Sequence, residues 1–138
     1  MSNLHVDIVS AEGQIHYGPA VVVSCPAEMG EIGIHARHAP LLTRLKPGDV
    51  RVKTPEGDEL HFFVGGGILE VQPHLVTVLA DTALREKDAD EAKAQEAMRQ
   101  AEQALSGAKD EMDQKAAQAL LAVASARLEF IKKLKTSR

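Results

Sequence analysis

The chain has 138 residues, which allows one ordinary domain or two small ones. Its net charge of −4 argues against general nucleic-acid binding, and no apolar run approaches the length needed to cross a bilayer. Apolar residues make up 44% of the chain and aromatic residues only 3%, so we expect an aliphatic core. The N-terminus does not have the pattern of a signal peptide, so we expect a cytoplasmic protein in which the single Cys25 is a small buried hydrophobic residue.

Residues 1–85 have the pattern of an antiparallel β-sandwich domain. Short apolar and β-branched runs alternate with polar residues, and turn signals such as Lys46-Pro47-Gly48-Asp49 separate them. Many short strands joined by regular turns are typical of a sandwich or a flattened barrel. The runs are residues 4–9, 20–23, 50–53, 60–64, 68–71 and 75–80.

Three consecutive glycines, Gly65-Gly66-Gly67, could form either a phosphate-binding loop or a corner of the sheet. A phosphate loop needs a lysine followed by serine or threonine at the start of a helix, whereas residues 68–71 read as a strand. Glycine also permits positive φ and close approach of two backbones. We therefore expect a bulge or tight corner here, followed by a hairpin turn at Pro73-His74.

Residues 86–138 have the pattern of an antiparallel helical hairpin. They contain no proline and one glycine, and they are rich in strong helix formers. Asp88 and Glu91 suggest a capping box, Gly107 suggests a left-handed stop after the first helix, and Asp110 suggests the cap of the second. We expect a seam made largely of alanine, with these residues: Ala94, Ala97, Met98, Ala101, Ala104, Leu105, Ala117, Leu120, Leu121, Ala124, Leu128 and Ile131.

Charge differs between the two arms of this hairpin. Residues 86–113 hold nine acidic and four basic side chains, whereas residues 114–138 hold one acidic and six basic side chains. Antiparallel pairing predicts that acidic residues of the first helix lie near the basic end of the second, with weak ion pairs. The residues concerned are Asp88, Asp90 and Glu91 on one side and Lys132, Lys133 and Lys135 on the other.

Three separated motifs resemble one known family. They are VSAE at residues 9–12, GEIGI followed by HAPLLT at residues 30–43, and GGGILEVQPHLVTVLADTA at residues 65–83. In this order they are similar to the signature of the ε subunit of F-type ATP synthase. The resemblance implies a sandwich of about ten strands that grips the γ subunit and rests on the ring of c subunits, followed by a hairpin that can extend to the α and β subunits and inhibit ATP hydrolysis. It also implies a non-catalytic, peripheral subunit on the cytoplasmic face of the bacterial plasma membrane, within a complex that couples proton flow to ATP synthesis.

The same resemblance suggests contact residues. It implies that Glu31 and His38 contact the c-ring, although Ala36-Arg37 stands where the family has Pro-Gly before the histidine. The apolar stretches suggest Leu41, Leu42, Ile68 and Val78 as γ contacts, and the basic end of the hairpin suggests Arg127, Lys132, Lys133 and Lys135 as the inhibitory contact.

The sequence was also searched for ligand and catalytic sites. Some family members bind ATP on the hairpin, and here Asp90, Lys93 and Arg127 would form a degenerate version of that motif, in which lysine lacks the bidentate geometry of arginine. We expect these residues to be ordinary surface residues, with ATP as the alternative. His35 and His38 lack the third ligand of a catalytic zinc site, and no catalytic triad is supported, so we expect neither metal nor catalysis. The remaining alternatives are a freestanding β-sandwich binding module with a coiled-coil scaffold arm, and a small metal-dependent enzyme.

Overall fold

The computed structural model describes residues 4–136, and these divide into two compact units. The first unit ends at Lys87 and holds every strand, and the second begins at Asp88 and holds two α-helices. The strands are β1 (Leu4–Ser10), β2 (Gly13–Ala20), β3 (Val22–Ala27), β4 (Gly30–His35), β5 (Leu41–Lys53), β6 (Glu59–Gln72), β7 (Leu75–Ala80) and β8 (Ala83–Arg85). The 3-10 helix η1 (Glu86–Asp88) precedes α1 (Glu91–Ser106) and α2 (Glu111–Thr136).

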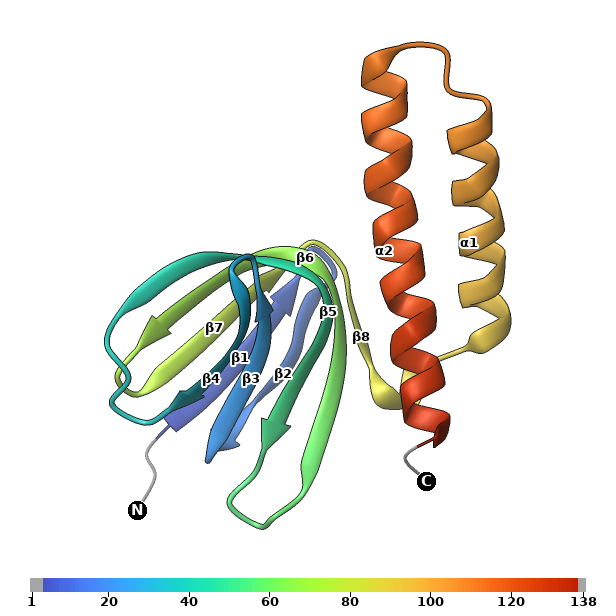
Figure 1. Ribbon diagram of the computed structural model, residues 1–138. Coiled ribbons are helices and arrows are strands. Elements are labelled where there is room, and N and C mark those ends of the chain that lie inside the picture. Colours follow the sequence, from blue (N-terminus) through green and yellow to red (C-terminus); the bar gives the residue numbers. More distant parts are fainter. Residues whose placement is uncertain (1–3, 137–138) are drawn as a thin grey trace. The chain divides into compact units, whose positions relative to one another are not determined.

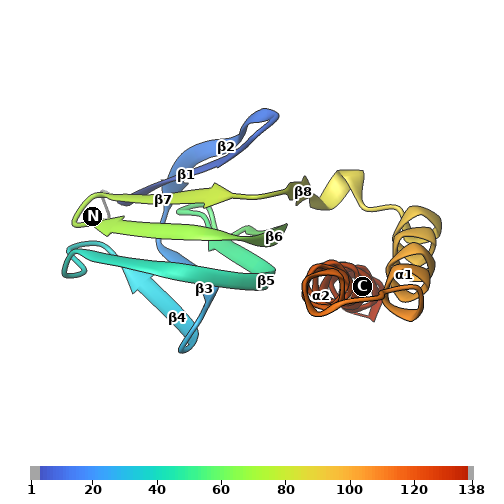
Figure 2. The same cartoon turned by 90° about the horizontal axis from the view of Figure 1, so that it is seen from above.

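The first unit is a β-sandwich built from one folded sheet. The strand order is β2-β1-β7-β6-β5-β3-β4, with β8 paired to β6. The long strands β5 and β6 pair along their whole length and bend together, so that the sheet folds over on itself (Figures 1 and 2). All pairings are antiparallel except that of β1 with β7, which run parallel. The sheet therefore differs from the purely antiparallel one that the sequence predicted.

The described residues form eight strands, fewer than the expected ten or so. Residues 60–64 and 68–71 were expected to be separate strands, but both belong to β6, which continues through the glycines. Gly66 and Gly67 have φ of 99° and 143°. A Cβ on Gly67 would lie 2.1 Å from the carbonyl oxygen of Leu79. The prediction of a close backbone approach at this corner is therefore confirmed.

The core of the sandwich is aliphatic, as the composition predicts. Leu4, Ile34, Leu69 and their buried neighbours fill it, and Phe62 is the aromatic member of this cluster. Cys25 is buried in it, and this burial raises the pKa of its thiol to about 12. Because the thiolate is the reactive form of cysteine, Cys25 is a structural residue.

The second unit is an antiparallel pair of helices joined by a short loop (Figure 1). The N-cap of α1 is Asp90, whose carboxylate accepts a hydrogen bond from the Lys93 backbone N–H at 3.2 Å. The predicted capping box at Asp88 is wrong, because Asp88 ends η1. Gly107 stops α1 where expected but with φ of −93°, so it is not left-handed, and Asp110 caps α2 as predicted, accepting from Asp113 N–H at 2.8 Å.

Small residues line the seam between the two helices. Ala94 and Ala101 on α1 and Ala117, Ala124 and Ile131 on α2 are buried and lie seven residues apart on each helix. This is the spacing of a coiled-coil seam. Phe130 and Leu134 are also buried near the end of α2. Two expected seam residues, Ala104 and Leu120, are exposed instead, because they lie near the hairpin loop, where the cavity described below separates the helices.

Candidate interaction surfaces

An exposed apolar patch lies on β5, β6 and β7. Leu42 is 70% exposed, Ile68 42% and Leu79 50%. Ile68 is directly paired with Leu79, and Leu42 is paired with Glu70, two residues further along β6, so all three side chains lie on the same outer face. Large aliphatic side chains gathered on one sheet face are a feature of protein interfaces. We call Leu42, Ile68 and Leu79 the outer patch.

The expected γ contacts fall on both faces of the sheet. Leu42 and Ile68 belong to the outer patch, whereas Leu41 packs against the core and Val78 is fully buried within it. Val78 therefore does not offer its side chain to a partner, whereas the next residue, Leu79, is exposed on the outer face. In the run LVTVLA nearly every residue is apolar, so alternation alone does not show which face is inward.

Glu31 and His38 lie at opposite ends of β4. Glu31 is exposed at the start of the strand and forms an ion pair with Arg51 of β5, and His38 lies in the loop that follows the strand. Glu31 and His35, the last residue of β4, are separated by about 13 Å at the rise of a β-strand. A single partner that contacts both Glu31 and His38 would have to extend along this edge strand.

Glu31 belongs to a chain of ionisable side chains that local sequence did not predict. Arg51 also lies 4.0 Å from Asp49, and the two ring nitrogens of His61 lie 3.1 Å from Asp49 and 3.2 Å from Glu59. The alternating charges of β5 and β6 were visible in the sequence, but only the register that pairs Arg51 with His61 brings them together. No group of three His, Cys, Asp or Glu side chains in residues 4–136 is arranged to hold a metal ion.

The basic end of α2 is exposed. Lys132, Lys133 and Lys135 are all exposed, and Lys135 forms an ion pair with Glu91 of α1. This pair agrees with the predicted approach of the acidic and basic ends of the hairpin. Arg127 differs from the lysines, since it is half-buried and its Nε is buried without a hydrogen-bond partner among the described residues.

The degenerate nucleotide motif is not gathered into one site. The carboxylate of Asp90 caps α1, and the Lys93 side chain is exposed. The Lys135–Glu91 contact places Lys135 beside the start of α1. Arg127 precedes Lys135 by eight residues of α2, so it lies about 12 Å along the helix from that point.

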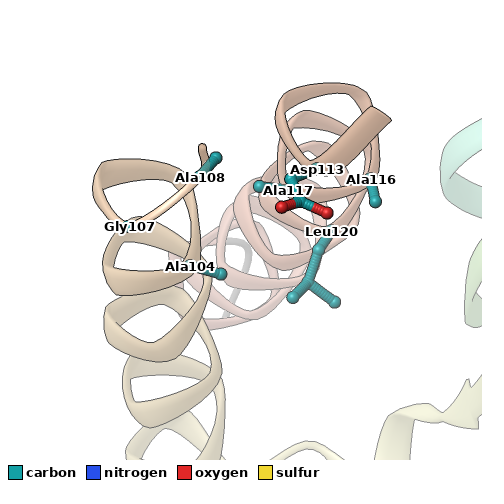
Figure 3. A pocket seen from close by; sticks show the side chains of 7 residues that line it. All are labelled: Ala104, Gly107, Ala108, Asp113, Ala116, Ala117 and Leu120. Atoms are coloured by element: carbon teal, nitrogen blue, oxygen red, sulfur yellow. The ribbon is translucent and has the colours of Figure 1, made fainter. Parts of the chain in front are cut away.

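The cavity of the hairpin lies near its loop and is far from that motif. It has a volume of about 290 Å³. Its lining, shown in Figure 3, consists of Ala104, Gly107, Ala108, Asp113, Ala116, Ala117 and Leu120. This lining contains no cation that could bind a phosphate.

A second cavity of about 230 Å³ lies in the sandwich, where the edge of β2 faces β6 and β8. The Arg85 guanidinium closes this gap by donating a hydrogen bond to the Ile15 carbonyl at 2.9 Å. His16 lies beside it, with its ring 5.0 Å from that of Phe62. Burial, and secondly the positive charge of Arg85, lower the pKa of His16, while Asp7 opposes this shift.

Both units match profiles of one protein family. Residues 3–86 match the ATP synthase delta/epsilon chain β-sandwich domain, and residues 87–132 match the long α-helix domain of the same chain. The ATP synthase epsilon chain of Alkalilimnicola ehrlichii is 58% identical over 135 residues, which cover 98% of this chain and 96% of the relative. That of Verminephrobacter eiseniae is 51% identical over 138 residues and the full length of both chains.

Solved structures show the same fold at low sequence identity. A chain of the Euglena gracilis mitochondrial ATP synthase, in a structure of OSCP, F1 and c-ring, has a TM-score of 0.76 and 20% identity, over 91% of this chain and 79% of that one. A chain from the central stalk and c-ring of the Tetrahymena thermophila enzyme has a TM-score of 0.62 and 13% identity, over 94% and 96%. No helix within residues 4–136 is both long and apolar enough to span a bilayer. The resemblance found from the three motifs is thereby confirmed, in preference to a freestanding binding module.

Proposed function

Since the chain belongs to the ATP synthase delta/epsilon family, as a non-catalytic epsilon chain of the central stalk, we propose that its sandwich binds the γ subunit and the c-ring while its helices inhibit ATP hydrolysis. In this proposal residues 1–85 form the rotor-binding domain and residues 86–138 the regulatory domain. The subunit is peripheral on the cytoplasmic face of the bacterial plasma membrane, and it helps to transmit rotation of the proton-driven c-ring through γ.

The outer patch is the observation that carries the proposed contact with γ. Three large aliphatic side chains stand exposed on neighbouring strands of a sheet whose other face is a complete core. Burying such side chains contributes about 1.5–3 kcal/mol each. A firm apolar contact suits a subunit that must turn together with γ without slipping.

The edge of β4 and the loop after it support the proposed contact with the c-ring. Glu31 and His38 flank this edge, and Glu31 forms an ion pair with Arg51 of β5. A contact that extends along the whole strand would use both residues and would not need them to meet.

The hairpin has the properties required of an inhibitory arm. Its exposed lysines offer positive charge to an acidic surface of the catalytic α and β subunits, and the Glu91–Lys135 pair holds one of them only weakly. Toward the loop its seam buries alanine, so little apolar area resists a rearrangement of the two helices there, while the large buried side chains Phe130, Ile131 and Leu134 lie near the end of α2. Arg127 is half-buried in this conformation, so its part in inhibition requires that α2 move first.

Binding of the purified chain to γ tests the proposal. Leu42→Ser, Ile68→Ser and Leu79→Ser should each weaken the affinity for γ by about tenfold or more, as expected for central interface residues. Val21→Ser is the matched control, because Val21 is also exposed but lies between β2 and β3, outside the outer patch. If the three variants bound γ as well as the unaltered chain does, the outer patch would not be the γ contact.

A further inference from the structure

Arg37 is the one non-glycine residue in residues 4–136 with a positive φ, which is 67°. For an L-residue this left-handed conformation is strained, and glycine avoids that strain. The backbone is held there, because the N–H of Arg37 donates a hydrogen bond to the Pro73 carbonyl at 2.7 Å. An arginine is thus kept at a position that would suit glycine better.

The loop that carries Arg37 and the turn beside it contain no acidic residue. Its loop lies beside the turn between β6 and β7 (Figures 1 and 2), and the N–H of His5 donates to the His74 carbonyl in that turn at 3.0 Å. Residues 4–6, 35–42 and 71–76 include His5, His35, His38 and His74 but neither aspartate nor glutamate. None of the ion pairs found within residues 4–136 involves Arg37, and its side chain is exposed. We call residues 35–40 and 72–75 together with His5 the histidine end of the sandwich.

We propose that Arg37 is a specificity-determining contact of the sandwich, which takes a carboxylate on the exposed loops of the c-ring. The inference rests on the proposed function, in which the loop of His38 faces that ring. A guanidinium is well suited to a carboxylate, because its planar donors bind both oxygens at once. The strained loop supplies this donor from a fixed position, and the absence of internal carboxylates leaves it free for the partner.

A protein carboxylate fits these observations better than a lipid phosphate does. Attraction to an anionic membrane generally needs several lysines or arginines together, and the histidine end has one guanidinium. A backbone locked by a hydrogen bond and held in a costly conformation provides directional recognition. Such recognition is useful against a fixed acceptor on a folded partner and of little use against a fluid headgroup.

Arg37→Gly separates the contact from stability. The variant keeps the loop conformation and relieves its strain, while the greater freedom of glycine in the unfolded chain offsets part of this gain, so its melting temperature should rise by about 2 °C. Its affinity for detergent-purified c-ring should nevertheless fall by roughly tenfold to a hundredfold, the usual range for loss of a charged hydrogen-bonding group. Arg37→Lys should also weaken binding, since lysine keeps the charge but loses the bidentate geometry.

Lys46→Ala is the matched control, because Lys46 is an exposed cation on the bend of β5, away from the histidine end. It should bind the c-ring as the unaltered chain does. Failure of the unaltered chain itself to bind the c-ring would overturn the proposed function, and the inference with it. If Arg37→Gly bound the c-ring as the unaltered chain does, the inference alone would be overturned. The same would follow if Arg37→Gly lost binding only to vesicles of anionic phospholipid and not to the c-ring.

Discussion

Gly67 is the residue on which the folding-over of the sheet depends most directly. A methyl group there would lie 2.1 Å from the Leu79 carbonyl oxygen and 2.9 Å from the Ala80 Cα, both of which are backbone atoms of β7. Gly67→Ala must therefore push β6 and β7 apart, at a cost of about 3 kcal/mol or more. Urea denaturation of the full chain would measure this loss of stability.

Gly33→Ala is the control for this prediction. Gly33 also lies in a strand, but its φ is not positive and a methyl group there would meet no atom within 4 Å. Its stability should stay within about 1 kcal/mol of the unaltered chain. Equal stability of the two variants would show that β6 and β7 do not approach as closely as described.

His16 should make the sandwich sensitive to mild acid. Its pKa is lowered in the folded state, chiefly by burial and then by Arg85, so the unfolded chain binds the proton more readily. The stability that depends on neutral His16 is therefore present above its ordinary pKa and is lost as the pH falls through the lowered value. Between about pH 7 and about pH 5, the melting temperature of the unaltered chain should fall more than that of His16→Gln. Parallel curves for the two proteins would contradict this assignment.

At the scale of the element, the start of α1 depends on a single side chain. Asp90 accepts the hydrogen bond of the Lys93 N–H, so Asp90→Ala should destabilise the hairpin by about 1 kcal/mol, while Asp90→Ser, which keeps the cap, should restore it. Hydrogen exchange of the first-turn amides of α1 would report the difference. Unchanged protection in Asp90→Ala would show that the cap lies elsewhere, for example at the originally expected Asp88.

The alanine seam of the hairpin leaves no room for larger side chains where it is fully buried. Ala101→Leu places three more carbons into the seam and should destabilise the helix pair by about 1–3 kcal/mol. Ala104→Leu, three residues along the same helix but exposed beside the cavity, should change stability by no more than about 0.5 kcal/mol. Thermal denaturation followed by circular dichroism compares the two, and equal melting would contradict the described seam.

The helix caps and the seam show which features of the hairpin can be predicted from its sequence pattern and which cannot. Composition and glycine placement predicted two helices and their turn, but Asp88 and Asp90 both suit an N-cap, and local sequence does not choose between them. Alanine at helical spacing predicted the seam, yet it did not show where the helices separate. Ala104 and Leu120 are exposed because of the splay at the loop, which depends on the packing of both helices together.

At the scale of the whole molecule, local pattern predicted the two-part architecture and most of the inward faces. It did not predict that β5 and β6 each pass unbroken around the bend, because glycine and proline within a run also signal the end of a strand. It placed Val78 on the outer face, although Val78 is buried, because β7 is apolar at nearly every position and its sequence does not show which residues point inward. The row of ionisable side chains from Glu31 to Glu59 depends on the register in which the strands pair. Local sequence does not show this register, because it is set by how all the strands pack together.

The ion pair between Glu91 and Lys135 predicts that removing Glu91 strengthens inhibition of ATP hydrolysis, whereas removing the lysines of α2 should weaken it. Glu91→Gln frees Lys135 for an acidic partner, so inhibition of ATP hydrolysis in the assembled enzyme should become stronger, by up to about fivefold, the limit for an exposed pair. Glu102→Gln, an exposed acidic residue of the same helix, is the control. Weaker inhibition by Glu91→Gln would mean that the pair supports the inhibitory state rather than competing with it.

The rate of ATP hydrolysis by the assembled ATP synthase tests the regulatory role most directly. Enzyme carrying the chain truncated after Lys87 should hydrolyse ATP faster than enzyme with the full chain. Enzyme with Lys132, Lys133 and Lys135 all changed to glutamine should approach the truncated one, while changing Lys109 and Lys115 to glutamine should have little effect. If truncation left the rate unchanged, the helices would not be an inhibitory arm; if truncation raised it but the triple variant did not, inhibition would not act through the basic end of α2.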